Sequence, residues 1–315
     1  MPHVLPTVYV ILLNTRTPHE TVDCLLSLEQ SEYRAFQVVV VENASGDDSL
    51  EVIQSGVLGH TTFPLHYLQS PANDGFAAGN NVGLRFAQAR GDGRYFWVLN
   101  NDTIVPPGAL GALVAAAEED RAAGRKIGQY GAKLLYHSHP DTIQAVGGSY
   151  EPWFGITREI GNMQKDRGQF DHHAPRPDIL IGASLFVSDD FLNDVGLLGD
   201  DYFLYYEEHD WARRGHTKGW GLRVVPACVI YHKQGVSTGG GRGDKANKSE
   251  FSDFYAFRNK LLFTARYYPW CLPTVYLGFV GMAINRVRRG QWRRLPMMLR
   301  LMCTFFTKPR YTLAP

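Results

Sequence analysis

Short, continuous runs of aliphatic and β-branched residues recur along the first 230 residues of the chain. The first three lie at residues 8–13, 37–41 and 65–69. Runs that are apolar on both faces are typical of strands buried in a parallel sheet. A polar turn and a stretch with helical spacing follow the first two, and this repeated order predicts an α/β protein built of βαβ units.

The same pattern predicts the later elements. Further strands are expected from residue 95 up to Asn100, at 127–136, at 179–187 and at 222–232, and helices at 107–121, 189–195 and 250–268. Residues 137–177 are rich in Gly, Pro and His, which predicts a long irregular segment. After residue 268, two apolar segments (270–284 and 295–306) flank a basic one (286–294), and the first is shorter than the roughly 20 residues that a spanning helix needs.

Charge divides the chain into two parts. Residues 258–315 hold 11 Lys and Arg and no acid, whereas the first 257 residues hold 21 basic residues against all 31 acids, a net charge of −10. We therefore predict a globular domain at residues 1–268 and a basic amphipathic helical tail at residues 269–315. The tail is expected to lie on an anionic membrane surface. The alternative is that the tail packs on the protein's own body or on a second subunit.

Composition narrows the class of protein. The chain has 315 residues, 44% of them hydrophobic, which is enough for one large domain with an appendage. Its four cysteines have no framework or Cys-x-x-Cys spacing, which favours reduced structural thiols in a cytosolic setting. Residues 1–7 contain neither a charged region nor a long apolar run, so a secretory signal is not expected.

Polar side chains follow several of the predicted strands. In open α/β sheets ligands bind beyond the carboxyl ends of the strands, so Asp102 is placed to hold a divalent cation against a diphosphate. Glu42 is placed to accept an N–H of uracil, thymine or guanine. The small residues between Asn73 and Gly83 allow a close backbone approach to phosphate at a helix N-terminus. The alternative for Asp102 and for Glu42 is ordinary turn and helix-cap chemistry.

A run of acids precedes the predicted strand at 222–232. On a helix Glu207 and Asp210 share one face and Glu208 points elsewhere, so the three acids have different roles. The alternative is a solvated acidic face paired with Arg213 and Arg214.

Five motifs in this order resemble the inverting glycosyltransferases of family 2, which have a GT-A fold. They begin at Glu42, Asn73, Asn100, Glu207 and His232, and the Asn-x-Asp form at Asn100–Asp102 is similar to that of rhamnosyltransferase-like members. The resemblance implies a mostly parallel nucleotide-binding sheet flanked by helices, a Mg²⁺ or Mn²⁺ ion at Asp102 with His232 beside it, and Glu208 as general base with Asp210 as the second candidate. It also implies an acceptor and sugar pocket at Gly182, Ala183, Glu207 and Trp211. The implied donor-binding residues are Asn14, Glu42, Asn73, Gly75, Phe76, Gly79, Asn80, Asn100 and Asn101.

The implied reaction moves a sugar from a nucleotide-diphosphate donor to a hydroxyl of a lipid-linked or cell-surface glycan. The first donor is dTDP-L-rhamnose and the second a UDP-hexose, and the enzyme would work on the inner face of the plasma membrane with no nucleic acid partner. A loop at residues 237–247 is expected to close over the donor, so that Lys245 within it and Lys248 directly after it meet phosphate.

Two rival functions remain at this point. An NAD-dependent oxidoreductase is disfavoured because the turn after the first strand reads Asn14-Thr-Arg-Thr-Pro rather than Gly-x-Gly-x-x-Gly. A non-catalytic scaffold docked on a membrane is disfavoured by acids at both Asp102 and Glu208. His137, His139, His172 and His173 are expected to be solvated loop histidines rather than metal ligands.

Overall fold

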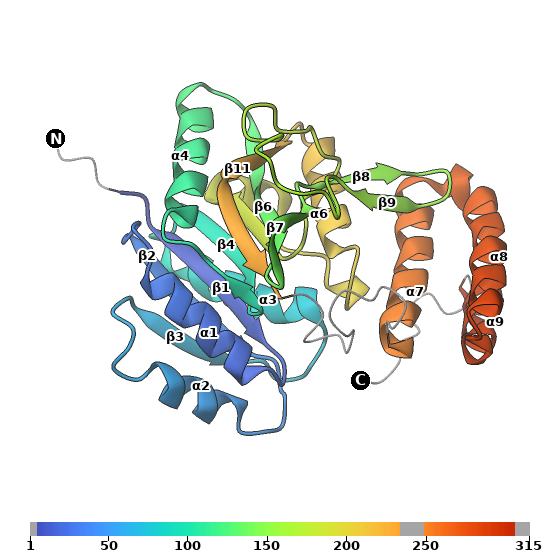
Figure 1. Cartoon of the computed structure of the whole chain (residues 1–315), viewed down its shortest axis with the longest axis horizontal. Helices are drawn as coiled ribbons and strands as arrows, with labels where there is room; N and C mark the ends of the chain where they lie inside the picture. Colours follow the sequence, from blue (N-terminus) through green and yellow to red (C-terminus); the bar gives the residue numbers. More distant parts are fainter. Residues whose placement is uncertain (1–4, 234–248, 306–315) are drawn as a thin grey trace.

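The computed structural model describes residues 5–233 and 249–305, and its centre is one nine-stranded sheet (Figure 1). The strand order is β3-β2-β1-β4-β10-β6-β11-β5, with β7 paired to β6. The strands are β1 (Val8–Asn14), β2 (Phe36–Glu42), β3 (Leu65–Gln69), β4 (Tyr95–Asn100), β5 (Thr103–Ile104), β6 (Ile127–Tyr136), β7 (His139–Ala145), β10 (Ser184–Ser188) and β11 (Gly221–His232). The expected α/β sheet flanked by helices is confirmed, and it is mixed: β1 to β4 run in parallel, whereas β5, β7 and β10 pair antiparallel with their neighbours.

The parallel half of the sheet brings its polar strand ends to one edge. β1 pairs in parallel with β2 and β4, and β2 pairs in parallel with β3. In this register Asn14 lies opposite Glu42, and Leu13 lies opposite Asn100. The polar residues that end three separate strands therefore meet at a single edge.

Helices cover both faces of the sheet. One face carries α1 (Pro18–Glu29), α2 (Ser49–Val57) and α4 (Ala109–Ala122), and the other carries α3 (Phe76–Arg90), α5 (Asp189–Val195) and α6 (Glu207–Thr217). Along β1, Val8, Val10 and Leu12 pack into the first core, while Tyr9 and Ile11 pack into the second. Because both faces are buried, the strand is apolar from Val8 to Leu13, as its sequence indicates.

Two parts of the chain differ from the expectation. The segment predicted to be irregular contains β7 and a separate two-stranded hairpin, β8 (Gly148–Glu151) and β9 (Ile156–Glu159). These strands are short and partly exposed, so they lack the continuous apolar run that marks the main sheet. In addition, Gly182 and Ala183 lie in a turn before β10 rather than in the middle of a strand.

Three helices form the C-terminal end of the described chain: α7 (Glu250–Tyr267), α8 (Leu272–Arg288) and α9 (Leu295–Thr304). Side chains of all three share one hydrophobic cluster, including Phe257, Phe279 and Leu301. The boundary predicted at residue 268 thus falls between helices that pack together. Across residues 5–233 and 249–305, no helix is both long and apolar enough to cross a membrane.

Candidate active site

The ends of β1 and β2 present two buried polar side chains at the edge where the parallel strands finish. Asn14 accepts a hydrogen bond from Thr21 Oγ1 at 3.0 Å, and its own Nδ2 finds no partner among the described residues. Glu42 Oε1 accepts from the Ser45 backbone N–H at 3.0 Å. The structure shows no hydrogen bond from a described residue to Glu42 Oε2, which leaves that oxygen available to a ligand.

Asp102 and His232 come together although 130 residues separate them. His232 Nε2 lies 3.1 Å from Asp102 Oδ1, and His232 Nδ1 lies 2.9 Å from Gln144 Oε1. The Gln144 oxygen only accepts, so Nδ1 carries the hydrogen in that contact. Nε2 faces Asp102 Oδ1, and Asn100 Nδ2 lies 3.5 Å from the same ring nitrogen. An imidazole oriented through its other nitrogen is typical of metal-binding histidines.

These residues fit a divalent cation. Burial alone would raise the pKa of Asp102, but the adjacent His232 outweighs it and holds the pKa below its usual range, so the carboxylate is charged. Asn100 Oδ1 is buried and has no partner in the described part of the chain. A carboxylate, an imidazole and an amide oxygen suit Mn²⁺ or Mg²⁺. Across residues 5–233 and 249–305, this site included, no group of three or more His, Cys, Asp or Glu could hold a metal, and the four loop histidines are exposed.

Asn101 has a different role from the one expected. Its Nδ2 donates to Thr17 Oγ1 and to Thr21 Oγ1, both at 2.8 Å, and the residue is buried. The side chain therefore ties the turn after β4 to the start of α1. We correct its assignment from donor contact to support of that turn.

The segment that begins at Asn73 approaches another part of the chain. Asn73 Oδ1 accepts from Asn43 Nδ2 at 3.0 Å and from the Gly75 N–H at 3.3 Å. Gly75 has φ +95°, and a Cβ built on it would lie 2.2 Å from the backbone oxygen of Phe203. The Phe76 N–H donates to that same oxygen at 2.6 Å. Gly75 and Phe76 thus connect the donor side of the site to the loop before α6.

Two more of the residues predicted to bind the nucleotide-sugar donor lie inside α3. A Cβ on Gly79 would lie 2.5 Å from Leu13 Cδ1, so the missing side chain lets α3 pack closely on β1. Asn80 is fully buried, and its Nδ2 donates to the Phe76 carbonyl at 2.9 Å. The glycine therefore serves helix–sheet packing rather than a direct approach to a ligand.

The loop before α6 has a strained backbone. Phe203, Tyr205 and Tyr206 have φ values of 65°, 69° and 77°, in the left-handed region that non-glycine residues rarely adopt. Asn259 of α7 stabilises this loop, because its Nδ2 donates to the carbonyls of Tyr202, Leu204 and Tyr205 at 2.7, 2.7 and 2.9 Å. Strain of this kind gathers at functional sites, where the surrounding structure enforces it.

Glu207 and Glu208 follow directly on this loop. Glu207 is 4% exposed, and burial, reinforced by the neighbouring Glu208, raises its pKa well above the usual range. A Cβ on Gly182 would lie 4.0 Å from Glu207 Oε1, so these two predicted pocket residues are adjacent. The Glu208 side chain is 15% exposed, and its Oε1 lies 3.5 Å from His209 Nδ1. The more accessible Glu208 is the better candidate for a base.

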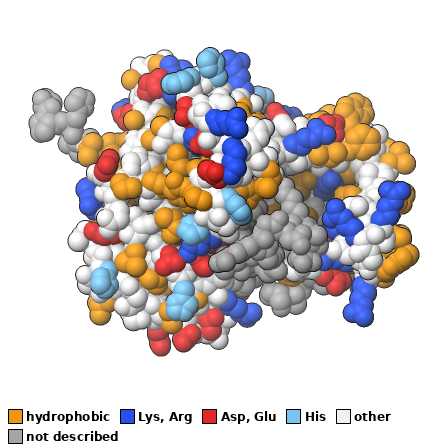
Figure 2. All heavy atoms as spheres, viewed as in Figure 1, with side chains coloured by type: hydrophobic (Ala, Val, Ile, Leu, Met, Phe, Trp, Pro, Cys, Tyr) orange, Lys and Arg blue, Asp and Glu red, His pale blue; other side chains and the backbone are white. Residues whose placement is uncertain are grey.

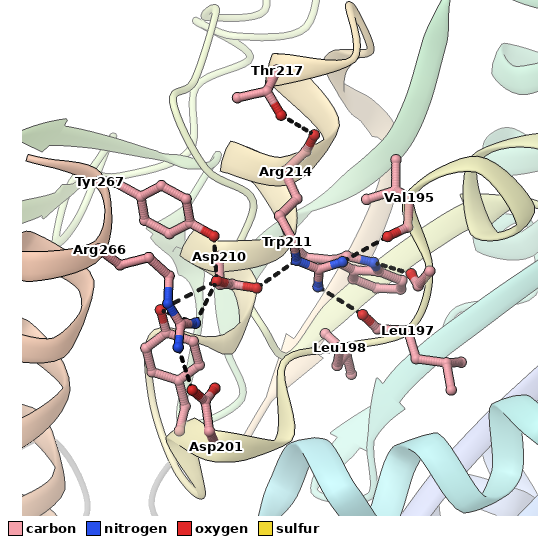
Figure 3. A network of polar contacts seen from close by, with 12 residues as sticks. Val195, Leu197, Leu198, Asp201, Asp210, Trp211, Arg214, Thr217, Arg266 and Tyr267 are labelled. Atoms are coloured by element: carbon pink, nitrogen blue, oxygen red, sulfur yellow. Dashed lines mark hydrogen bonds and ion pairs between the residues drawn. The ribbon is translucent and has the colours of Figure 1, made fainter. Parts of the chain in front are cut away.

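Asp210 is bound inside a polar network (Figure 3). Its Oδ1 accepts from Tyr267 at 2.6 Å and from Arg266 at 3.1 Å, and its Oδ2 accepts from Arg214 Nε at 2.6 Å. Both oxygens of this buried carboxylate are already bound by protein side chains. The structure therefore corrects the second candidate for the base: Asp210 joins α6 to α7.

Trp211 is also placed differently from the expectation. Its ring is fully buried, packs against Phe191 at 5.5 Å between centroids, and donates from Nε1 to the Gly196 carbonyl at 2.8 Å. No surface of this ring is open to a sugar. Trp211 is a core residue rather than part of an acceptor pocket.

The residues expected to bind the sugar donor and the acids of α6 lie at the same end of the sheet. The Asn100 N–H donates to the Ala183 carbonyl at 3.0 Å, and Gly182 lies beside Glu207 as described above. Sequence reasoning missed two contributors: Gln144, which orients His232, and His209, whose Nε2 lies 2.7 Å from Thr157 Oγ1. Gln144 lies in the segment that was expected to be irregular, where only a register with β6 would reveal it. Lys245 and Lys248 lie outside the described residues.

The site thus combines an α/β sheet, a buried Asp–His pair where its strands end and two nearby glutamates. This arrangement is typical of a glycosyltransferase. The model of the family described as "Glycosyl transferase family 2" matches residues 7–174, more than half of the chain. The protein belongs to this family.

Known proteins agree with this assignment. The chain is 21% identical over 239 residues to the low-salt glycan biosynthesis hexosyltransferase Agl10 of Haloferax volcanii, which covers 72% of this chain and 66% of that protein, just under two thirds of its length. The mannosyltransferase PcManGT of Pyrobaculum calidifontis, solved with GDP-Man and Mn²⁺, aligns with a TM-score of 0.57 and 15% identity over 98% of this chain and 83% of that chain. S. aureus TarS 1-349 with UDP-GlcNAc aligns with a TM-score of 0.52 and 16% identity over 81% of this chain and 66% of that chain. The fold is therefore a GT-A fold.

Proposed function

We propose that this protein is an inverting hexosyltransferase that moves a sugar from a nucleotide-diphosphate donor to a hydroxyl of a glycan acceptor. The observation that supports this most is the pairing of a buried, charged Asp102 with His232 at the sheet edge that also holds Glu207 and Glu208.

In this proposal Asp102, His232 and the oxygen of Asn100 hold a Mn²⁺ or Mg²⁺ ion, and Gln144 fixes the imidazole ring. The ion, when bound, supplies positive charge for the leaving diphosphate. Glu208 accepts the proton of the acceptor hydroxyl, which attacks the anomeric carbon from the face opposite the diphosphate and inverts its configuration. Neutral Glu207 donates a hydrogen bond to the sugar or acceptor, and Gly182 leaves room for the ring.

The identity of the donor is not decided by Glu42. A carboxylate such as Glu42 accepts an N–H of thymine, uracil or guanine alike, so we rank dTDP-L-rhamnose first and a UDP-hexose second on the family resemblance alone. PcManGT was solved with GDP-Man and TarS with UDP-GlcNAc, so proteins of this fold bind more than one nucleotide. The relation to a glycan biosynthesis enzyme supports a glycan acceptor. We further propose that this glycan is lipid-linked or on the cell surface and that the reaction takes place on the cytoplasmic side of the plasma membrane.

Two variants test the proposal by separating donor binding from chemistry. Thermal shifts are measured with dTDP, UDP and GDP sugars, each with and without Mn²⁺, and sugar release is followed for the best donor. Asp102→Asn should abolish the Mn²⁺-dependent shift and the turnover together. Glu208→Gln should keep the shift and lower kcat by about 10²–10⁴-fold, the range of a lost general base.

Asp190→Asn is the matched control. Asp190 makes an exposed ion pair with Arg94 at the opposite edge of the sheet, so its loss should change neither binding nor turnover. A folded wild-type protein that neither binds nor cleaves any donor in the panel would refute the enzyme and leave the non-catalytic scaffold. Turnover that survives Asp102→Asn unchanged would refute the assigned metal site.

A further inference from the structure

Large apolar side chains gather on one end of the molecule. Of the twelve large hydrophobic residues that the structure shows as exposed, nine lie on the β8–β9 hairpin and on the chain around α8 and α9. We call this set the apolar end face. It consists of Trp153, Phe154, Ile156, Trp270, Leu277, Val280, Ile284, Trp292 and Leu299. Patches of this kind mark interaction sites.

The apolar end face is held together by contacts between the hairpin and α8. Thr274 Oγ1 of α8 donates to the carbonyl of Trp153 in the hairpin turn. One turn further along α8, a Cβ on Gly278 would lie 3.6 Å from Phe154 Cδ1, an ordinary packing distance. The hairpin tip and the helix therefore form one surface, which the sequence alone does not reveal.

Helix α8 is apolar on two sides. Val275 and Phe279 are fully buried against α7 and α9, whereas Leu277, Val280 and Ile284 follow helical spacing on the outer side, and Leu277 is 66% exposed. A helix that is apolar nearly all round is normally covered on both sides. The outer stripe runs along the helix, so the covering surface is parallel to the axis of α8.

The charges around this face select its partner. Arg286 and Arg294 are both bound to Asp253. Arg288, Arg289 and Arg293 are exposed and form no ion pair with any residue that the structure describes. Apolar and basic side chains lie together on this helical end of the molecule in Figure 2, and residues 269–315 contain no acid. The partner is thus apolar within and negatively charged at its surface.

We propose that the apolar end face docks on a lipid bilayer that carries anionic headgroups. The outer side of α8 and the hairpin tip enter the acyl boundary, Trp270 and Trp292 lie at headgroup level, and the three arginines meet lipid phosphate. A second copy of the chain fits less well, since a twofold contact would bring the same arginines against one another. This inference does not depend on the proposed glycosyl transfer.

Vesicle flotation tests the docking. The full-length protein is mixed with vesicles of phosphatidylcholine alone or with about one third phosphatidylglycerol, at low and high salt. We expect binding to the anionic vesicles that weakens with salt. The triple variant Arg288→Ala, Arg289→Ala, Arg293→Ala should partition about a hundredfold more weakly, at about a factor of five for each arginine.

Leu277→Glu and Trp153→Ala probe the helix and the hairpin separately, and each should reduce binding at least tenfold. Leu58→Glu is the control, because Leu58 is 79% exposed on a different part of the surface and its change should have no effect. The proposal would be overturned if the wild-type protein did not bind anionic vesicles. It would also be overturned if the protein were a dimer in solution and Leu277→Glu dissociated that dimer. Donor cleavage in solution should persist in these variants, so a failure here is distinct from a failure of the enzyme.

Discussion

Gly75 is the residue at which the donor side of the site touches the loop that carries the acids. Its positive φ and its close approach to Phe203 allow no side chain. Gly75→Ala should therefore lower the free energy of unfolding by about 3–5 kcal/mol, from backbone strain together with overpacking. Urea unfolding measures the change.

Gly46 supplies the comparison for Gly75. It also has a positive φ, +72°, but a Cβ there would meet nothing within 4 Å. Gly46→Ala should cost only the left-handed strain, about 1–2 kcal/mol. Equal losses in the two variants would contradict the steric part of the argument.

Glu207 makes the free energy of unfolding depend on pH. Its pKa is raised in the folded state from an ordinary value of 4.5, so above that pH the folded protein retains a proton that the unfolded chain releases. Stability from this group is complete below pH 4.5 and falls as the pH rises toward the folded-state pKa. Glu207→Gln should raise Tm at about pH 8 and change it little at about pH 4.

Glu51 provides the control for this titration. It is exposed on α2, and Glu51→Gln should leave Tm unchanged at both pH values. A glutamine variant at position 207 that is less stable than the wild type at the higher pH would show that the carboxylate is charged and paired in the fold.

At single positions the sequence predicted which residues lie at the site better than it predicted the contacts that each side chain makes. Asp102 and His232 were expected at one metal site and do lie together, because β5 begins directly after Asp102 and pairs with the end of β11, which sets Thr103 opposite His232. Asn101 and Trp211 matched motif positions equally well, yet their side chains are used by α1 and by the core. A motif shows which residue types are present but not where their hydrogen bonds go.

Among the elements, α6 places three acids in three environments. Glu207 is buried without a charge partner, Glu208 is partly open, and Asp210 is bound by Arg214 and Arg266. The helical spacing foretold that the three would differ. It could not show that Asp210 faces α7, because the arginine and tyrosine that bind it lie more than 50 residues away.

Asp210→Asn and Glu208→Gln should separate structure from catalysis. Removing the charge of Asp210 weakens its hydrogen bonds with Arg214 and Arg266, although Arg266 keeps Asp201, and should cost about 1.5–3 kcal/mol of stability. Glu208→Gln should leave Tm within a few degrees of the wild type while turnover falls. The outcome against this view is an Asp210→Asn protein of normal Tm with no turnover, which would restore Asp210 as the base.

The main strands were predicted to within one residue at most ends, because burial on both faces leaves a continuous apolar run. β3 and β6 match their expected bounds completely. The hairpin β8–β9 was missed for the opposite reason: its side chains are largely exposed, and its stability comes from contacts with α8 rather than from its own pattern.

On the scale of the whole molecule, α7 joins the sheet domain to the C-terminal helices. Arg266 and Asn259 bind the loop and α6, while Phe254, Phe257 and Leu261 pack against α8 and α9. Composition and charge located the start of the basic tail, but the shared core of three helices depends on packing that no local pattern displays.

A chain that ends at residue 268 tests this connection. It would expose the apolar side of α7, and we expect it to aggregate or to unfold at a clearly lower temperature than the full-length protein. Asp253→Asn is the milder comparison, since it removes only the carboxylate that holds Arg286 and Arg294. A shortened chain that is monomeric and equally stable would support the domain boundary at residue 268.

The hairpin β8–β9 has contacts at both of its ends. Its tip rests on α8 through Trp153, and Thr157 in its second strand holds the imidazole of His209, the neighbour of Glu208 in the sequence. An engineer who trims this hairpin to obtain a more soluble protein would also release that ring. Such a shortened protein would be more soluble but would turn over more slowly. Its rate would not represent that of the full-length protein.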